Sequence, residues 1–106
     1  MAKNLKFYRD ELDVARARGP ISEKLLTIFL ETDLQDDTIA LQALMDDLWA
    51  VEHGHADERE FTGNAHTVVI KPEGIVISSN ADEAQPDYVA KLKHFSDVLQ
   101  DWEAFI

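Results

Sequence analysis

The stretch from Phe61 to Asn80 constrains the fold of this chain more than any other part of its sequence. Two runs rich in valine, isoleucine and threonine, His66 to Ile70 and Ile75 to Ser79, are typical of β-strands. Four residues that include Pro72 and Gly74 separate them. Proline favours the second position of a type I turn, and glycine accepts the left-handed conformation that closes it. The stretch therefore predicts two antiparallel strands joined by a four-residue loop.

Closing that loop also predicts which residues pair across the hairpin. The expected pairs are Ile70 with Ile75, Val69 with Val76, and Val68 with Ile77. Because side chains alternate between the two faces of a strand, one face carries only large aliphatic residues. Those residues are Val68, Ile70, Ile75 and Ile77. We expect this face to form the floor of the hydrophobic core.

Three helices are predicted around the hairpin. The first begins at Ser22, a favourable N-cap, and a break near Asp33 to Asp36 separates it from the second. The second runs from about Asp37 to His53 and ends at Gly54. Its inward stripe, which leaves Asp46 and Asp47 facing water, consists of Leu41, Leu44, Met45 and Leu48.

The third helix is predicted at the C-terminal end. Pro86 suits its first turn, and apolar residues then recur in steps of four and three. Those residues are Tyr88, Leu92, Phe95, Leu99 and Trp102, and we expect the middle three to cover the apolar face of the hairpin. Both Trp49 and Trp102 are expected in the core, whereas an exposed tryptophan would be a candidate anchor for a protein partner.

The segment from Leu5 to Arg18 fits two structures. As a hairpin that turns near Glu11 to Asp13, it places Leu5 and Phe7 on one face. As a helix, it places Leu5, Tyr8, Leu12 and Ala15 at helical spacing. Periodicity slightly favours the helix, but the residues alone leave both structures open.

Composition narrows the possible partners. The chain has 106 residues, no cysteine, 21 acidic and 10 basic residues, and a net charge of −11. A single domain spanning residues 1–106 is expected from this length. Phosphate binding needs lysine and arginine, so nucleic acid and anionic membranes are disfavoured as direct partners, and a basic protein is favoured. The chain lacks a long apolar run and a signal-like N-terminal segment, which predicts a soluble cytoplasmic protein.

The negative charge is concentrated in the middle third of the chain. Residues 31–60 hold ten acidic residues and a single basic one, Arg59. Such crowding of like charge is a candidate means of steering a basic partner. The predicted partner-binding residues are Asp36, Asp37, Asp46, Asp47, Glu52, Asp57, Glu58 and Glu60.

Few residues in the sequence suggest catalysis. His53 and His55, beside Glu52 and Asp57, are of types that bind zinc or nickel, but Gly54 interrupts the helix that would align them. Adjacent aspartates on a helix point in different directions, and His66 and His94 stand alone in the sequence. The sequence has no phosphate-binding loop and no nucleophile elbow. We therefore expect no catalytic residues, no metal site and no cofactor, and predict that the chain is not an enzyme.

Several segments together resemble a known family. They are KFYRD and VARAR near the N-terminus, the helical region Ser22 to His53, the stretch EFTGNAHTVVIKPEGIVISSN, and the closing FSDVLQDWEAFI. The layout resembles the small acidic bacterial YacL-like proteins and related immunity proteins of bacterial toxin systems, including contact-dependent growth inhibition. The resemblance implies a hairpin at Leu5 to Arg18.

With that hairpin, the expected fold is α+β. It is an antiparallel sheet of about four strands, formed by two hairpins and covered by two or three helices in the order β-β-α-α-β-β-α. The resemblance implies an immunity protein whose acidic surface binds and neutralises a toxin domain, with a nuclease as the expected target. The alternative is a non-enzymatic regulatory module that binds another basic cellular protein.

Overall fold

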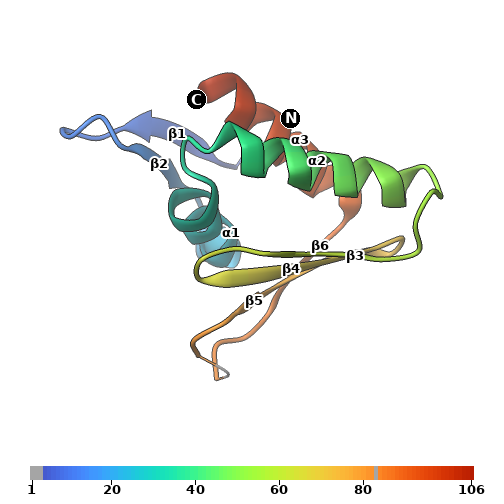
Figure 1. Cartoon of the computed structure of the whole chain (residues 1–106). Helices are drawn as coiled ribbons and strands as arrows, with labels where there is room; N and C mark the ends of the chain where they lie inside the picture. The colour runs from blue at the N-terminus through green and yellow to red at the C-terminus, as the bar shows by residue number, and fades with distance from the viewer. Residues whose placement is uncertain (1–3, 83) are drawn as a thin grey trace.

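A computed structural model describes residues 4–82 and 84–106. Its strands form two antiparallel sheets, one of two strands and one of four (Figure 1). The helices lie over one face of the four-stranded sheet, and the other face is left open. This arrangement confirms the α+β class expected from the sequence.

The N-terminal segment is a hairpin, made of β1 (Lys6–Arg9) and β2 (Ala15–Arg18). Asp10 closes its turn, because the carboxylate accepts hydrogen bonds from the amides of Leu12 at 2.8 Å and Val14 at 3.0 Å. These bonds, with a further one from Arg16, hold the pKa of Asp10 below its usual value. Local side-chain bonding of this kind favours a turn over a helix, which explains why the hairpin forms.

The two hairpins do not join into one sheet, contrary to expectation. The larger sheet has the order β3-β4-β5-β6, so β4 (His66–Lys71) and β5 (Gly74–Ser79) already have neighbours on both sides. Those neighbours are β3 (Arg59–Thr62), which was not among the predicted strands, and β6 (Tyr88–Ala90), in a stretch predicted as the start of a helix. The β1–β2 hairpin instead packs Phe7 edge-on against Trp102, with ring centroids 5.0 Å apart.

The predicted pairing within the central hairpin is confirmed. Ile70 faces Ile75, Val69 faces Val76, and Val68 faces Ile77. The loop is shorter than predicted, because Lys71 also pairs with Gly74 and only two residues remain between the strands. Gly74 has a φ of 152°, which favours glycine.

The middle of the chain contains the predicted break between two helices. A 3₁₀ turn, η1 (Ile21–Glu23), leads into α1 (Lys24–Phe29), so Ser22 is not the helix cap that was expected. A π-helical turn, η2 (Leu30–Leu34), follows and ends at Gln35, whose φ is 45°. The next helix, α2 (Thr38–Glu52), is capped by Asp37 and ends before Gly54, which has a φ of 74°.

The C-terminal helix begins later than predicted. α3 spans Leu92–Phe105, because Tyr88 to Ala90 pair with Ile75 to Ile77 as strand β6 before the helix starts. Its buried residues include Phe95, Leu99 and Trp102. The indole N–H of Trp102 donates to the carbonyl oxygen of Gln35 at 2.9 Å, which joins α3 to the end of η2.

The core lies between the helices and the inner face of the larger sheet. The four predicted floor residues, Val68, Ile70, Ile75 and Ile77, are fully buried. Burying an aliphatic side chain of this size contributes about 1.5–3 kcal/mol. Within the described ranges, no helix is both long and apolar enough to cross a membrane.

Candidate protein-binding surface

The outer side of α2 carries an exposed tryptophan. The inner side buries Leu41, Leu44, Leu48 and Val51 against the core. Trp49, in contrast, is 52% exposed, so its predicted burial is wrong, while the burial of Trp102 is confirmed. The reason is helical spacing, because Trp49 follows Gln42 by seven residues and Asp46 by three and shares their side of the helix.

Two imidazole rings hold this tryptophan in place. His53 stacks on Trp49 with ring centroids 4.3 Å apart, and His55 stacks on it at 5.1 Å. His53 also donates from Nδ1 to the carbonyl oxygen of Trp49 at 2.9 Å. The positive φ of Gly54 turns the chain so that His55 returns to the helix, where its amide bonds to the carbonyl oxygen of Ala50. Trp49, His53 and His55 form what we call the Trp49 platform.

Acidic residues lie at the same end of the helix as the Trp49 platform. Asp46 is one turn before Trp49 on the exposed side of α2 and accepts a hydrogen bond from Gln42 at 2.9 Å. Glu52 is in the last turn of the helix, and Asp57 is in the loop that follows. Both are exposed, and neither forms an ion pair with another residue of the described ranges. The platform is therefore a rigid aromatic surface with uncompensated negative charge beside it.

The other predicted partner-binding residues do not join this surface. Asp36 pairs with Arg9 at 3.3 Å, and Asp37 caps α2 through the amides of Ile39 and Ala40. α2 has 15 residues, which corresponds to about 22 Å, and both aspartates lie at the end away from Trp49.

The remaining three predicted residues lie on β3, just before it, or on the part of α2 that contacts it. Asp47 pairs with Arg59 at 3.7 Å, and Glu58 pairs with Lys71 at 3.8 Å. Glu60 pairs in register with Val69, which puts it on the open face of the sheet. The eight predicted residues therefore form several separate groups.

Among the described residues, no third ligand joins His53 and His55 to make a metal site. Within residues 4–82 and 84–106, no group of three or more histidine, cysteine, aspartate or glutamate side chains is arranged to hold a metal ion. The stacking of both imidazoles on Trp49 is the arrangement observed instead.

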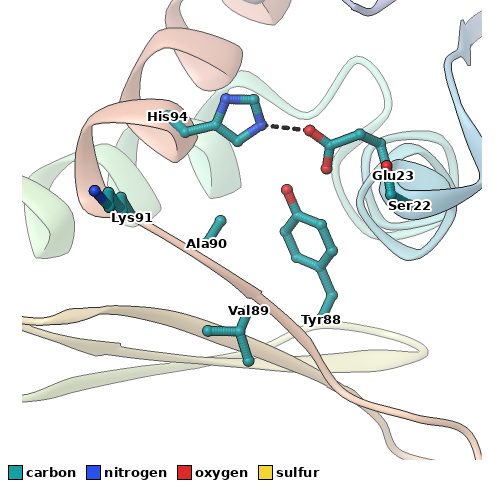
Figure 2. A pocket seen from close by; sticks show the side chains of 7 residues that line it. All are labelled: Ser22, Glu23, Tyr88, Val89, Ala90, Lys91 and His94. Carbon is teal, nitrogen blue, oxygen red and sulfur yellow. Dashed lines mark hydrogen bonds and ion pairs between the residues drawn. The ribbon is translucent and has the colours of Figure 1, made fainter.

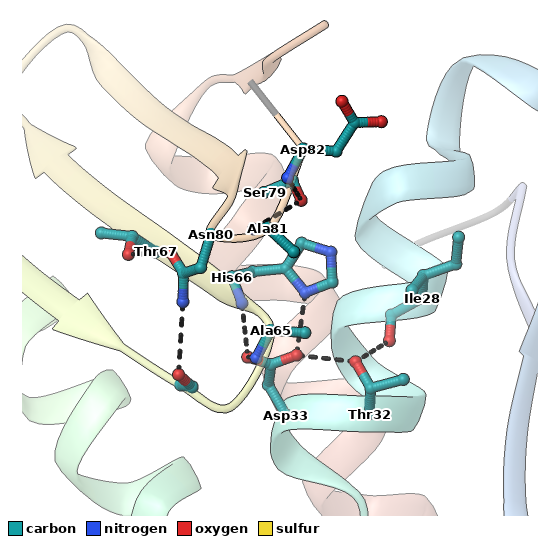
Figure 3. Close-up of polar contacts among 11 residues, drawn as sticks. Ile28, Thr32, Asp33, Ala65, His66, Thr67, Ser79, Asn80, Ala81 and Asp82 are labelled. Carbon is teal, nitrogen blue, oxygen red and sulfur yellow. Dashed lines mark hydrogen bonds and ion pairs between the residues drawn. The ribbon is translucent and has the colours of Figure 1, made fainter. Parts of the chain in front are cut away.

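A buried carboxylate joins η2 to the larger sheet (Figure 3). Asp33 accepts hydrogen bonds from the amides of Ala65 and His66, both at 3.0 Å, and from His66 Nδ1 at 2.8 Å. Burial would raise the pKa of Asp33, but these bonds and one from Thr32 outweigh it and lower the pKa. His66 is therefore satisfied within the fold, and its chain separation from Asp33 hid the pair from sequence reasoning.

A second polar cluster lies where β6 meets α1 and α3 (Figure 2). The carboxylate of Glu23 accepts a hydrogen bond from His94 Nε2 at 2.6 Å, and the hydroxyl of Tyr88 also donates to it. Burial, and then this bond to Glu23, raise the pKa of Tyr88. The cluster borders an open hollow of about 360 Å³, with Lys91 on its rim. Tyr88 and His94 both bond to Glu23, so the cluster braces the fold.

Comparisons of the chain with protein-family models, with curated proteins and with solved structures give no match. The proposal for its function therefore depends on its own residues and geometry.

Proposed function

We propose that this chain is a cytoplasmic immunity protein that binds and neutralises a bacterial toxin. The observation that carries the proposal is the Trp49 platform beside Asp46, Glu52 and Asp57. Tryptophan is among the residues that contribute most to binding energy at protein interfaces, above all when it is already held in the binding conformation.

Charge supports a basic partner. The net charge of −11 raises the rate at which a positively charged protein is captured, and acidic side chains near Trp49 guide that protein to the platform. A toxin that cleaves nucleic acid has a basic active site because it must hold phosphates. An acidic surface that covers such a site blocks substrate without any chemistry of its own, so we also propose that the chain is not an enzyme.

The proposal narrows the set of contact residues. Asp46, Glu52 and Asp57 become the central acidic contacts, because Asp46 and Glu52 are three residues from Trp49 on α2 and Asp57 follows His55 by two residues. Asp36, Asp47 and Glu58 already have cationic partners within the chain, and Asp37 caps a helix. These four contribute to the long-range field and not to direct contacts.

The test starts from a tagged chain produced in its source cells, with its bound protein identified by mass spectrometry. The purified partner is then titrated with wild-type chain and with Trp49→Ala, which we expect to weaken binding about 30-fold. Ile21→Ala is the matched control, because Ile21 is 91% exposed and lies beside β6, whereas α2 packs over β3 and β4 toward the opposite edge of the sheet. Equal loss in both variants, or none in either, would contradict the role of Trp49.

Two further measurements complete the test, namely the salt dependence of binding and the survival of cells that make the partner. Binding to a basic partner should weaken as sodium chloride is raised from about 50 mM to 500 mM, because exposed charges are screened. Cells that make the partner should die unless they also make the chain. If the partner is harmless to cells, the chain is a regulatory module that uses the same surface.

A further inference from the structure

Strand β6 is an edge of the larger sheet. In the part of the chain that the structure describes, no strand pairs with its outer side. Two open hollows border this edge, one lined by Glu23 and His94 and the other by Ile21, Leu25 and Pro86. Val89, at the centre of β6, is 69% exposed. The edge is therefore accessible along its length.

The register shows which backbone groups the edge offers. The carbonyl oxygen of Ala90 would lie 2.5 Å from a Cβ on Gly74, so this carbonyl points toward β5. Hydrogen-bonding direction alternates along an antiparallel strand, so the amide and carbonyl of Val89 point away from β5. Asp87 and Lys91 lie two residues to either side of Val89 in the same alternation, although the carbonyl of Lys91 already accepts from the amide of Phe95 at the start of α3. The backbone of Lys91 is extended, with a φ of −75° and a ψ of 153°.

We propose that β6 pairs antiparallel with β6 of a second copy of the chain, about a two-fold axis at Val89. Val89 then faces its own counterpart and exchanges two backbone hydrogen bonds with it. The same register places Asp87 of each copy opposite Lys91 of the other. The edge is thus complementary to itself in both backbone bonding and charge.

The open face of the sheet supports this register. Val69, Val76 and Val89 lie in one row across β4, β5 and β6. Pairing at Val89 extends the row into the second copy, so that two rows of three valines become one. On the inner face, Tyr88 of each copy lies opposite the small side chain of Ala90 in the other.

The balance of charge favours β6 over the rest of the surface as the place where two copies of the chain meet. Two molecules that each carry −11 repel one another, so they meet most easily where acidic and basic residues balance. Asp87 and Lys91 balance, and the Glu23 carboxylate is already bonded to His94 and Tyr88. α2 and its acids pack over β3 and β4, toward the opposite edge. The pairing consumes the β6 edge of both copies, so association stops at a dimer and leaves the Trp49 platform accessible.

A cysteine cross-link tests the register directly. The chain has no cysteine, so Val89→Cys introduces a single thiol at an exposed site. Residues that form a hydrogen-bonded antiparallel pair have Cα atoms about 5.5 Å apart, a distance that a disulfide spans. Oxidation should give a covalent dimer at low micromolar concentration. Ile39→Cys, at an 83% exposed site on α2, is the control and should stay monomeric. Equal cross-linking of both variants, or none at position 89, would overturn the proposed axis.

A charge exchange tests the complementarity. Asp87→Lys and Lys91→Asp each replace two attractive pairs with two repulsive ones, so each should weaken dimerisation at least about tenfold in sedimentation experiments. The double variant restores both pairs and should dimerise again. An equal mixture of the two single variants should form a heterodimer, because each then meets its opposite charge. A wild-type chain that stays monomeric up to about 1 mM, or single variants that dimerise as well as wild type, would refute the pairing.

Discussion

The carboxylate of Asp33 and the imidazole of His66 form a buried pair, with Oδ1 and Nδ1 2.8 Å apart, although 32 residues separate them in the chain. The pair joins the π-helical turn to the start of β4. The Asp33 side chain is completely buried, and two backbone amides share its other oxygen. These bonds fix the position of η2 over the sheet.

Replacing Asp33 with asparagine should destabilise the fold by about 2–3 kcal/mol, because an amide nitrogen cannot accept the hydrogen bonds from Thr32 and His66. Urea denaturation monitored by circular dichroism measures this change. Asp57→Asn is the matched control, since Asp57 is exposed and has no partner among the described residues, and it should stay within about 0.5 kcal/mol of wild type. An Asp33→Asn variant as stable as wild type would show that the buried pair contributes nothing.

The pH dependence of stability should reveal the same carboxylate. The pKa of Asp33 is lowered in the folded protein, so its contribution is fully present above the unfolded value of about 3.8 and is lost as pH falls through the folded value. The difference in unfolding free energy between wild type and Asp33→Asn should therefore be constant between pH 6 and pH 5 and shrink below about pH 4. Asp10, whose pKa is also lowered, affects both proteins equally. A difference that grows with acidification would contradict this sign.

Gln35 should be replaceable by glycine with a gain in stability. Its φ of 45° and ψ of −125° lie in a region that side chains disfavour, at a cost of about 1–3 kcal/mol. Glycine removes that strain and keeps the carbonyl that accepts the Trp102 bond. After the entropic cost of glycine, we expect a net gain of about 1 kcal/mol, measured by thermal and urea unfolding. Gln42→Gly, within α2, should lose a similar amount because it interrupts a regular helix.

Removing the hydroxyl of Tyr88 should weaken the junction between β6 and α1. Tyr88→Phe leaves Glu23 with His94 as its remaining partner in the cluster, at an expected cost of about 1 kcal/mol. Tyr8→Phe is the control, because Tyr8 is 41% exposed on the β1–β2 hairpin, and it should cost less than about 0.5 kcal/mol. If Tyr88→Phe and Tyr8→Phe lowered the free energy of unfolding in urea equally, the bond to Glu23 would not explain the effect at Tyr88.

The two tryptophans should differ in their access to solvent. Trp49 is 52% exposed and Trp102 is fully buried. A Trp102→Phe variant should therefore show strong acrylamide quenching of its remaining fluorescence, whereas Trp49→Phe should be protected. A protected signal in both variants would mean that another part of the chain, or a second molecule, covers α2.

Most of what could be predicted about the fold followed from short-range features of the sequence. The central hairpin was predictable because its β-branched runs, turn residues and alternation all indicate the same structure. The break between η2 and α2 and the end of α2 at Gly54 followed from caps and breakers. The start of α3 did not, because Tyr88 to Ala90 suit a helix locally and become a strand only through pairing with β5.

The candidate site was harder to predict than the fold. Acidic residues could be counted along the chain, but their partners are distant in sequence, as Asp36 with Arg9 and Glu58 with Lys71 show. The spacing of Trp49 from Gln42 and Asp46 was a local indication that Trp49 is exposed. Its stacking with His55 depends on the turn at Gly54, which periodicity does not describe.

The contact of Phe7 with Trp102 joins the first strand to α3, so it can form only after α3 has left the ribosome. Translation delivers the sheet before α3, so the part of the face of Val68, Ile70, Ile75 and Ile77 that α3 covers stays exposed until this helix emerges. The nascent chain is then in the state most exposed to aggregation, and chaperones that recognise aliphatic surface would have their target in this interval. The packing of α3 is therefore expected to complete this core.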